Sequence, residues 1–240
     1  TRSLSSCSRS CRGLHTNGLL RTQGARRRFC ASASRANAPP SYPMTFLSNC
    51  EAITRLAGNQ NGTDLDDATK QIIQKQIEQV EACCERGNAV ANVPIDDGTY
   101  ELVYSSSTNT SAGKLGPFVG EVLQVFPSPD DEEVRALAEQ ANSKSDKPVN
   151  VERTYRNIVN LFGGLLTVSL DAVLTVRDAE TIDVYFVQTT FSLNRGAIPV
   201  TRQPFDPLRG GYWKCSVNES GWRVLTANTG NVFVLKNKNV

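Results

Sequence analysis

Residues 97–107 carry the pattern that most limits how this chain can fold. An Asp-Gly turn pair is followed by strict alternation, in which Tyr100, Leu102 and Tyr104 share one face. A period of two with aromatic side chains on one face predicts a half-buried β-strand. The chain before this strand has helical spacing, and the chain after it alternates between short strands and turns.

The chain after residue 97 predicts a series of antiparallel strands. A Gly-Gly pair at residues 163–164 separates two apolar runs, which is the pattern of a hairpin. We expect strands over residues 98–106, 118–126, 151–162, 165–176, 181–193, 212–217, 222–227 and 232–236. About eight or nine strands predict a mainly β fold, a small closed antiparallel barrel with room for one small ligand.

Two segments interrupt this strand pattern. Residues 195–211 contain Pro199, Pro204 and Pro207, so they are expected to form a long loop or a broken edge strand. Residues 127–148 are acidic and rich in alanine, which predicts a solvated surface insertion with one helical turn.

Residues 39–95 are expected to form two helices ahead of the barrel. Apolar residues recur at helical spacing over residues 44–57, and a Gly/Asn-rich segment ends that helix. Thr63 is expected to cap a second helix, whose apolar stripe consists of Ile72, Ile73, Ile77, Val80 and Cys84. Such an apolar stripe can pack on a membrane surface or on the outside of the barrel. The opposite face of this helix has mixed charge, which favours packing on the barrel.

Residues 1–38 have the composition of an organellar transit peptide. They contain eight arginines, many serines and no acidic residue. The run RRRFCASA resembles a chloroplast processing site, with cleavage expected near Cys30 and Ala31, whereas mitochondrial import and a disordered basic tail are the alternatives. The expected organisation is therefore a transit-like segment (1–38), N-terminal helices (39–95) and a barrel (96–240).

The remainder of the chain is acidic, although the whole sequence has a net charge of +2. Without the eight N-terminal arginines, 18 basic residues stand against 24 acidic ones. An acidic domain repels phosphate backbones, so nucleic acid is not an expected partner, and it gains no attraction to anionic headgroups. No apolar run approaches the ~18 residues of a transmembrane helix, so no span is expected.

The sequence offers little of the chemistry that enzymes use. Its single histidine, His15, lies in the transit-like segment, so His-based catalysis and His-ligated metals are not expected. It contains no Gly-x-Ser-x-Gly elbow, no Gly-rich phosphate loop and no metal-binding cysteine pair. Glu152, Asp171 and Asp183 fall on different expected strands. We therefore expect a protein without enzymatic activity, metal or cofactor, whose cysteines are reduced.

Four fragments, in order, resemble the plastid lipid-associated proteins, also called plastid fibrillins. The first, GTYELVYSS at 98–106, is similar to the opening Gly-x-Trp-x-Leu-x-Tyr-Thr-Ser of that family. GPFVGEVLQVF at 116–126 and RNIVN at 156–160 are similar to its middle strands. The fourth, WRVLTANTGNVFVL at 222–235, resembles its C-terminal Leu-Arg-Ile…Gly-x-Leu-Phe-Val-Leu signature. Tyr100 stands in place of the usual Trp, and Thr226-Ala227 in place of an Arg-Gly pair.

This resemblance covers residues 45–237 and implies a lipocalin-like barrel in the chloroplast, at plastoglobules, thylakoids or in the stroma. It implies binding of hydrophobic molecules such as prenylquinones, carotenoids or fatty acids, peripheral contact with plastid lipid surfaces, and no enzymatic activity. The alternative is a structural or scaffold protein of plastid lipid bodies, or of isoprenoid-lipid biosynthesis enzymes, without its own ligand.

Two sets of residues are the candidate site. In lipocalin-like folds an arginine from the last strands can cover an aromatic residue of the first strand, so we expect Arg223 to stack on Tyr100 and close one barrel end. The expected apolar wall of a ligand cavity is Tyr104, Val122, Phe126, Ile182, Val184, Phe186 and Phe233. Its expected polar anchors are Gln124, Asn157 and Gln188. The same side chains suit a filled core, and the sequence leaves the two alternatives open.

Overall fold

The computed structural model describes residues 44–84, 98–108, 112–127, 132–145 and 149–239. The expected transit-like segment and its cleavage site lie outside these residues. Within them, no helix is both long enough and apolar enough to cross a membrane.

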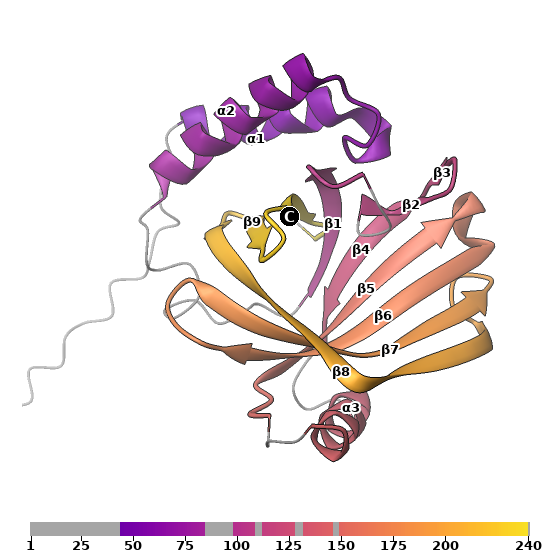
Figure 1. Ribbon diagram of the computed structural model, residues 1–240. Coiled ribbons are helices and arrows are strands. Elements are labelled where there is room, and N and C mark those ends of the chain that lie inside the picture. Colours follow the sequence, from indigo (N-terminus) through magenta and orange to yellow (C-terminus); the bar gives the residue numbers. More distant parts are fainter. Residues whose placement is uncertain (1–43, 85–97, 109–111, 128–131, 146–148, 240) are drawn as a thin grey trace, which may run out of the picture. The chain divides into compact units, whose positions relative to one another are not determined.

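Eight antiparallel strands form a closed barrel, as predicted (Figure 1). Around the barrel each strand from β4 to β10 pairs with the next one in the chain, and β1 closes the ring between β10 and β4. This up-and-down order is lipocalin-like. The barrel strands are β1 Gly98–Ser105, β4 Glu121–Phe126, β5 Arg153–Leu161, β6 Leu166–Val176, β7 Thr181–Leu193, β8 Ile198–Glu219, β9 Trp222–Ala227 and β10 Val232–Asn237. Strands β2 (Lys114–Leu115) and β3 (Phe118–Val119) form a separate small hairpin.

Two helices precede the barrel, and the first has the predicted bounds. Helix α1 spans Met44–Ala57, a short 3-10 turn follows over Gly58–Gln60, and α2 spans Asp67–Cys83. Their apolar side chains share one buried cluster with outward-facing residues of β1, β8, β9 and β10. This contact confirms that the α2 stripe packs on the barrel, although Ile72 remains 49% exposed.

The predicted cap of the second helix is wrong. Asp66, not Thr63, is the N-cap of α2, and its Oδ1 accepts a hydrogen bond of 2.7 Å from the backbone N–H of Thr69. That bond lowers the pKa of Asp66. The side chain of Thr63 is buried instead, three residues before the cap.

The acidic insertion forms a third helix, α3, over Glu132–Ser143. Leu137 and Ala141 of this helix pack against Val173 and Val187 on the outer face of β6 and β7. The helix is longer than the single turn expected because its apolar residues have this outer surface to cover.

A bulge in β1 overturns the predicted face of Tyr104. Pairing with β10 runs Leu102↔Leu235 and then Tyr104↔Val234, so Val103 is an extra residue. Tyr104 and Val103 both lie in the cluster that contacts the helices, whereas Leu102 remains inside the barrel. Tyr104 is therefore not a residue of the barrel interior.

Residues 198–211 belong to strand β8, so this segment follows the predicted alternative of a broken edge strand rather than that of a long loop. The segment pairs with β7 from Ile198↔Leu193 to Lys214↔Thr181, with register shifts on the way. Its pairing with β9 begins only at Trp213. All three prolines lie in the first half of β8, which pairs with β7 but not with β9. The missing N–H donors of these prolines therefore interrupt no hydrogen-bond ladder with β9.

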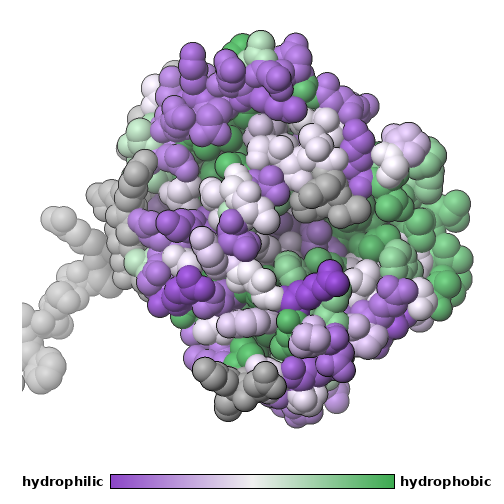
Figure 2. Space-filling view, in the orientation of Figure 1, coloured by the Kyte–Doolittle hydropathy of each residue, from purple (hydrophilic) through white to green (hydrophobic). Residues whose placement is uncertain are grey.

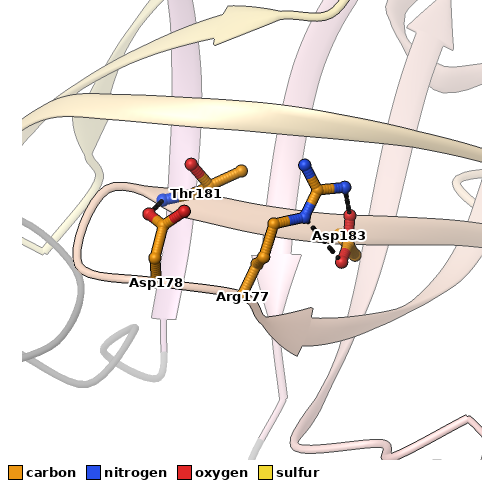
Figure 3. A network of polar contacts seen from close by, with 4 residues as sticks. All are labelled: Arg177, Asp178, Thr181 and Asp183. Carbon is orange, nitrogen blue, oxygen red and sulfur yellow. Dashed lines mark hydrogen bonds and ion pairs between the residues drawn. The ribbon is translucent and has the colours of Figure 1, made fainter.

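The turn from β6 to β7 is held by side chains at the end of the barrel away from the β5–β6 turn (Figure 3). Oδ1 of Asp178 accepts hydrogen bonds from the backbone N–H groups of Glu180 at 2.9 Å and Thr181 at 2.8 Å. Arg177 forms an ion pair with Asp183 on the adjoining strand. These local bonds hold the turn between the segments 165–176 and 181–193, which were expected to be strands.

Candidate ligand cavity in the barrel

Arg223 and two aromatic rings form the floor of the barrel. The guanidinium carbon lies 4.1 Å from the ring centroid of Tyr100 and 4.6 Å from that of Phe126. Nη2 of Arg223 also donates a hydrogen bond of 3.1 Å to the Tyr100 hydroxyl. Both side chains are 2% exposed, and β1, β4 and β9 supply the three residues. The predicted contact between Arg223 and Tyr100 is therefore present.

Two further aromatic residues extend this floor. The Tyr155 ring lies 5.4 Å from Phe126 and 4.9 Å from Trp213, measured between centroids. Burial raises the pKa of the Tyr155 phenol, so its hydroxyl stays protonated. The rings form a packed aromatic layer across one end of the barrel.

A cavity of about 540 Å³ lies between this floor and the opposite end of the barrel. Its wall is mostly apolar, and every barrel strand except β1 contributes to it. The apolar and aromatic residues of the wall include Tyr155, Val159, Leu161, Val168, Leu170, Val184, Phe186, Phe191, Trp213 and Phe233. Its mouth lies beside Leu115 of β2, Phe205 of β8 and the β9–β10 turn.

Two amide side chains are the main polar groups deep in the wall. Gln124 of β4 and Asn157 of β5 are direct partners in the register of the two strands. The side-chain carbonyl oxygens of both residues are buried and have no hydrogen-bond partner among the described residues. A buried acceptor without a partner costs about 1–3 kcal/mol, so the pair favours a molecule that brings a donor.

The structure brings together five of the predicted cavity residues. Gln124, Asn157, Val184, Phe186 and Phe233 all line the cavity.

Val122, Phe126 and Ile182 point into the same barrel core but lie outside the cavity wall. Tyr104 faces the helices, and Gln188 lies on the outer face, where it donates a hydrogen bond of 2.9 Å to Asp171. A bulge after Phe186 turns Gln188 outward, which the alternation of the sequence did not reveal.

Sequence reasoning missed Tyr155 and Trp213. Both residues lie in segments that were predicted to be strands, and both carry the large side chains that a barrel floor needs. Pairing the predicted hairpins residue by residue would have placed them inside, because each is an inward neighbour of a residue already assigned to the interior.

The carboxylates considered for catalysis lie outside the cavity wall. Asp171 is paired with Arg156 at 2.6 Å on the outer face, and Asp183 is paired with Arg177. Across the described ranges, no group of three or more His, Cys, Asp or Glu residues is arranged to hold a metal ion.

The four cysteines of the described residues are free thiols. Burial raises the pKa of Cys50 to about 12 and the pKa of Cys215 to about 11. Both thiols are therefore protonated at neutral pH and poor nucleophiles.

Comparison with known proteins adds no relative to this geometry. No family model, no curated protein and no solved structure matches the chain.

Proposed function

We propose that this protein binds a small hydrophobic molecule inside its barrel. The observation that carries the proposal is the cavity of about 540 Å³, whose wall is mostly apolar and includes the aromatic side chains of Tyr155, Phe186 and Trp213. Ligand pockets for small molecules are commonly about 300–1,000 Å³, mostly apolar and provided with a few polar groups. The side-chain carbonyl oxygens of Gln124 and Asn157, which have no partner among the described residues, supply such groups.

The proposed ligand class is a prenylquinone, a carotenoid or a fatty acid. Support for this class comes from the resemblance of residues 98–106 and 222–235 to the plastid lipid-associated proteins. The same resemblance supports a place in the chloroplast, at plastoglobules or thylakoids, and a role without catalysis. A scaffold protein that has no ligand needs no cavity, so the open interior favours the carrier.

A direct test is to extract the natively purified protein with organic solvent and to analyse the extract by mass spectrometry. We expect an isoprenoid or acyl lipid in a fixed ratio to protein. A titration with cis-parinaric acid, a fluorescent fatty acid, then measures affinity in solution.

A matched pair of variants tests whether the cavity is the site. Leu170→Trp places a larger side chain inside the cavity and reduces its volume. Ile158→Trp places the same side chain on the outer face of the neighbouring strand. We expect Leu170→Trp to weaken binding by about tenfold or more, as for a lost 1.4 kcal/mol of contact. Ile158→Trp is expected to bind like the parent. Equal affinities for the two variants would exclude the barrel interior as the site, provided that circular dichroism shows both to be folded.

A further inference from the structure

Exposed apolar side chains gather at the end of the barrel where the cavity opens. Seven of the nine large hydrophobic residues that are exposed in the described chain lie in three neighbouring connections. These are Leu115 and Phe118 of the β2–β3 hairpin, Phe162 and Leu165 of the β5–β6 turn, and Leu193, Ile198 and Val200 of the β7–β8 hairpin. We call these seven residues the apolar rim. Figure 2 shows green side chains gathered on the side where Figure 1 places β3 and the adjoining ends of β5, β6 and β7.

The rim is one continuous surface. The rings of Phe118 and Phe162 are in contact, with centroids 4.7 Å apart. Backbone hydrogen bonds from Asn194 to Leu165 (3.1 Å) and from Arg195 to Gly164 (2.7 Å) join the β5–β6 turn to the β7–β8 hairpin. Leu115 belongs both to the rim and to the cavity mouth, so the rim borders the entrance.

The chain segments that carry the rim contain basic residues and no acidic ones, and the adjoining Glu121 is paired with Lys238 at 2.7 Å. Residues 112–120, 161–170 and 187–205, which include it, contain Lys114, Arg195 and Arg202 but neither Asp nor Glu. Lys114 is paired with Asp64 at 3.3 Å, which leaves Arg195 and Arg202 on the β7–β8 hairpin as the main positive groups. The acidic balance of residues 39–240 therefore does not describe this end of the barrel.

A second cavity, of about 400 Å³, lies outside the barrel beside the same hairpin. It is lined by Arg156, Arg195 and Arg202 and by hydroxyl groups of β6 and β7. Its one carboxylate, Asp171, is held by Arg156 at 2.6 Å and by Gln188 at 2.9 Å. Three guanidinium groups against one carboxylate give this groove a net positive charge, which suits an anionic headgroup.

We infer that the apolar rim inserts into an anionic lipid surface, while Arg195 and Arg202 bind the headgroups beside it. Insertion removes a contiguous apolar surface from water, and each basic residue near an anionic surface adds attraction. The cavity mouth then opens toward lipid, so a hydrophobic ligand enters without crossing water. This last step rests on the proposed ligand-binding function, whereas the docking itself does not.

The test is flotation of the full chain with vesicles of pure phosphatidylcholine or of phosphatidylcholine with about one third phosphatidylglycerol. We expect Phe162→Ser with Leu165→Ser, and Ile198→Ser with Val200→Ser, each to weaken binding to both vesicles by about tenfold or more. We expect Arg195→Gln with Arg202→Gln to weaken binding to the anionic vesicles by about tenfold and to leave the neutral vesicles unaffected.

Matched controls lie on the helices. Leu47 and Ile72 are 45% and 49% exposed, and Arg55 and Lys75 are exposed basic residues of α1 and α2. Leu47→Ser with Ile72→Ser, and Arg55→Gln with Lys75→Gln, are expected to float like the parent. The basic residues 1–38 are common to every protein compared, so their attraction to anionic vesicles cancels.

Two results overturn the inference: rim variants that float like the parent, or helix variants that lose as much binding as rim variants.

The experiments distinguish a failure of lipid docking from a failure of the proposed ligand binding. Rim variants that lose flotation but bind cis-parinaric acid in solution support both proposals. Parent protein that floats through the rim and binds no fatty acid refutes the proposed function alone.

Discussion

The guanidinium of Arg223 lies over the ring of Tyr100 and donates a hydrogen bond to its hydroxyl, although the two residues are 123 positions apart in the chain. This contact joins β1 to β9 in the aromatic layer across one end of the barrel. Both side chains are buried, so the contact is shielded from competing water.

Replacing Tyr100 is expected to lower the unfolding free energy of the barrel, and by more for Leu than for Phe. Tyr100→Phe removes the hydrogen bond to a charged group, which is worth about 1.5–3 kcal/mol of unfolding free energy. Tyr100→Leu also removes the cation–π contact, for a further ~0.5–2 kcal/mol. Urea unfolding measures both changes. The more exposed pair of Arg177 and Tyr212, 5.1 Å apart, is the control, and a loss of similar size for Tyr212→Leu would contradict the role of burial.

Gln124→Met is expected to make the protein more stable and less selective. The substitution removes a buried carbonyl without a hydrogen-bond partner, so the unfolding free energy should rise by about 1 kcal/mol or more. Displacement of cis-parinaric acid by a long-chain alcohol should become about tenfold weaker, while displacement by an alkane of equal length should not change.

Gln188→Met is the matched control for that prediction. Gln188 is also buried, but its amide donates a hydrogen bond to Asp171 outside the barrel. The control should lose stability and keep the affinity of the parent for both ligands. A stability loss for Gln124→Met would show that the amide of Gln124 has a structural role, and a gain for Gln188→Met would contradict the stabilising hydrogen bond of Gln188 to Asp171.

Gly62→Ala is expected to be more harmful than Gly58→Ala, although both glycines have positive φ. A Cβ at Gly62 would lie 2.5 Å from Cδ2 of Tyr104, whereas a Cβ at Gly58 meets nothing within 4 Å. We expect a loss of about 1 kcal/mol at position 58, from backbone strain, and about 2–4 kcal/mol at position 62. Thermal unfolding of the two variants measures the difference, and equal losses would mean that the Tyr104 ring moves freely.

Stability is expected to fall as the pH rises from about 9 to 12. Burial raises the pKa of Cys50 from 9.0 to about 12 and of Cys215 from 9.0 to about 11. Over this range the unfolded chain loses thiol protons that the folded chain keeps. The unfolding free energy therefore declines by up to about 1.4 kcal/mol per pH unit for each thiol.

Cys50→Ala should make this alkaline decline shallower. Urea unfolding at pH 8, 9, 10 and 11 gives the slopes. A slope that Cys50→Ala does not alter would assign the decline to other groups.

Alternation and turn residues predicted the barrel because most of its pairings are local hairpins. The strand bounds at 165–176 and 181–193 agree with β6 and β7 within one residue, since Gly-Gly and Arg-Asp turns flank them. Features that depend on a distant partner were not predictable in this way. Nothing in the local pattern shows that Val103 is an extra residue, because the bulge exists only relative to β10.

The candidate site was partly predictable for the same reason. Inward-facing residues follow from alternation up to the first bulge, which explains why Val184 and Phe186 were placed correctly and Gln188 was not. Whether a barrel interior is hollow depends on how the side chains of eight strands pack together. The volume of the cavity therefore cannot be predicted from a sequence pattern. The rim was missed because exposure, unlike periodicity, is a property of the folded surface.

Strand β1 lies between β4 and β10, so the first strand of the barrel can complete its pairing only after the last strand has been made. The pairings from β4 through β10 join consecutive strands and can form as a ribosome delivers them. Tyr100 meets Asn237 only after residue 237 has been synthesised. Until then the growing chain holds an open sheet with unpaired edges, which are templates for aggregation. The interval before β10 emerges is therefore when a newly made chain most depends on chaperones.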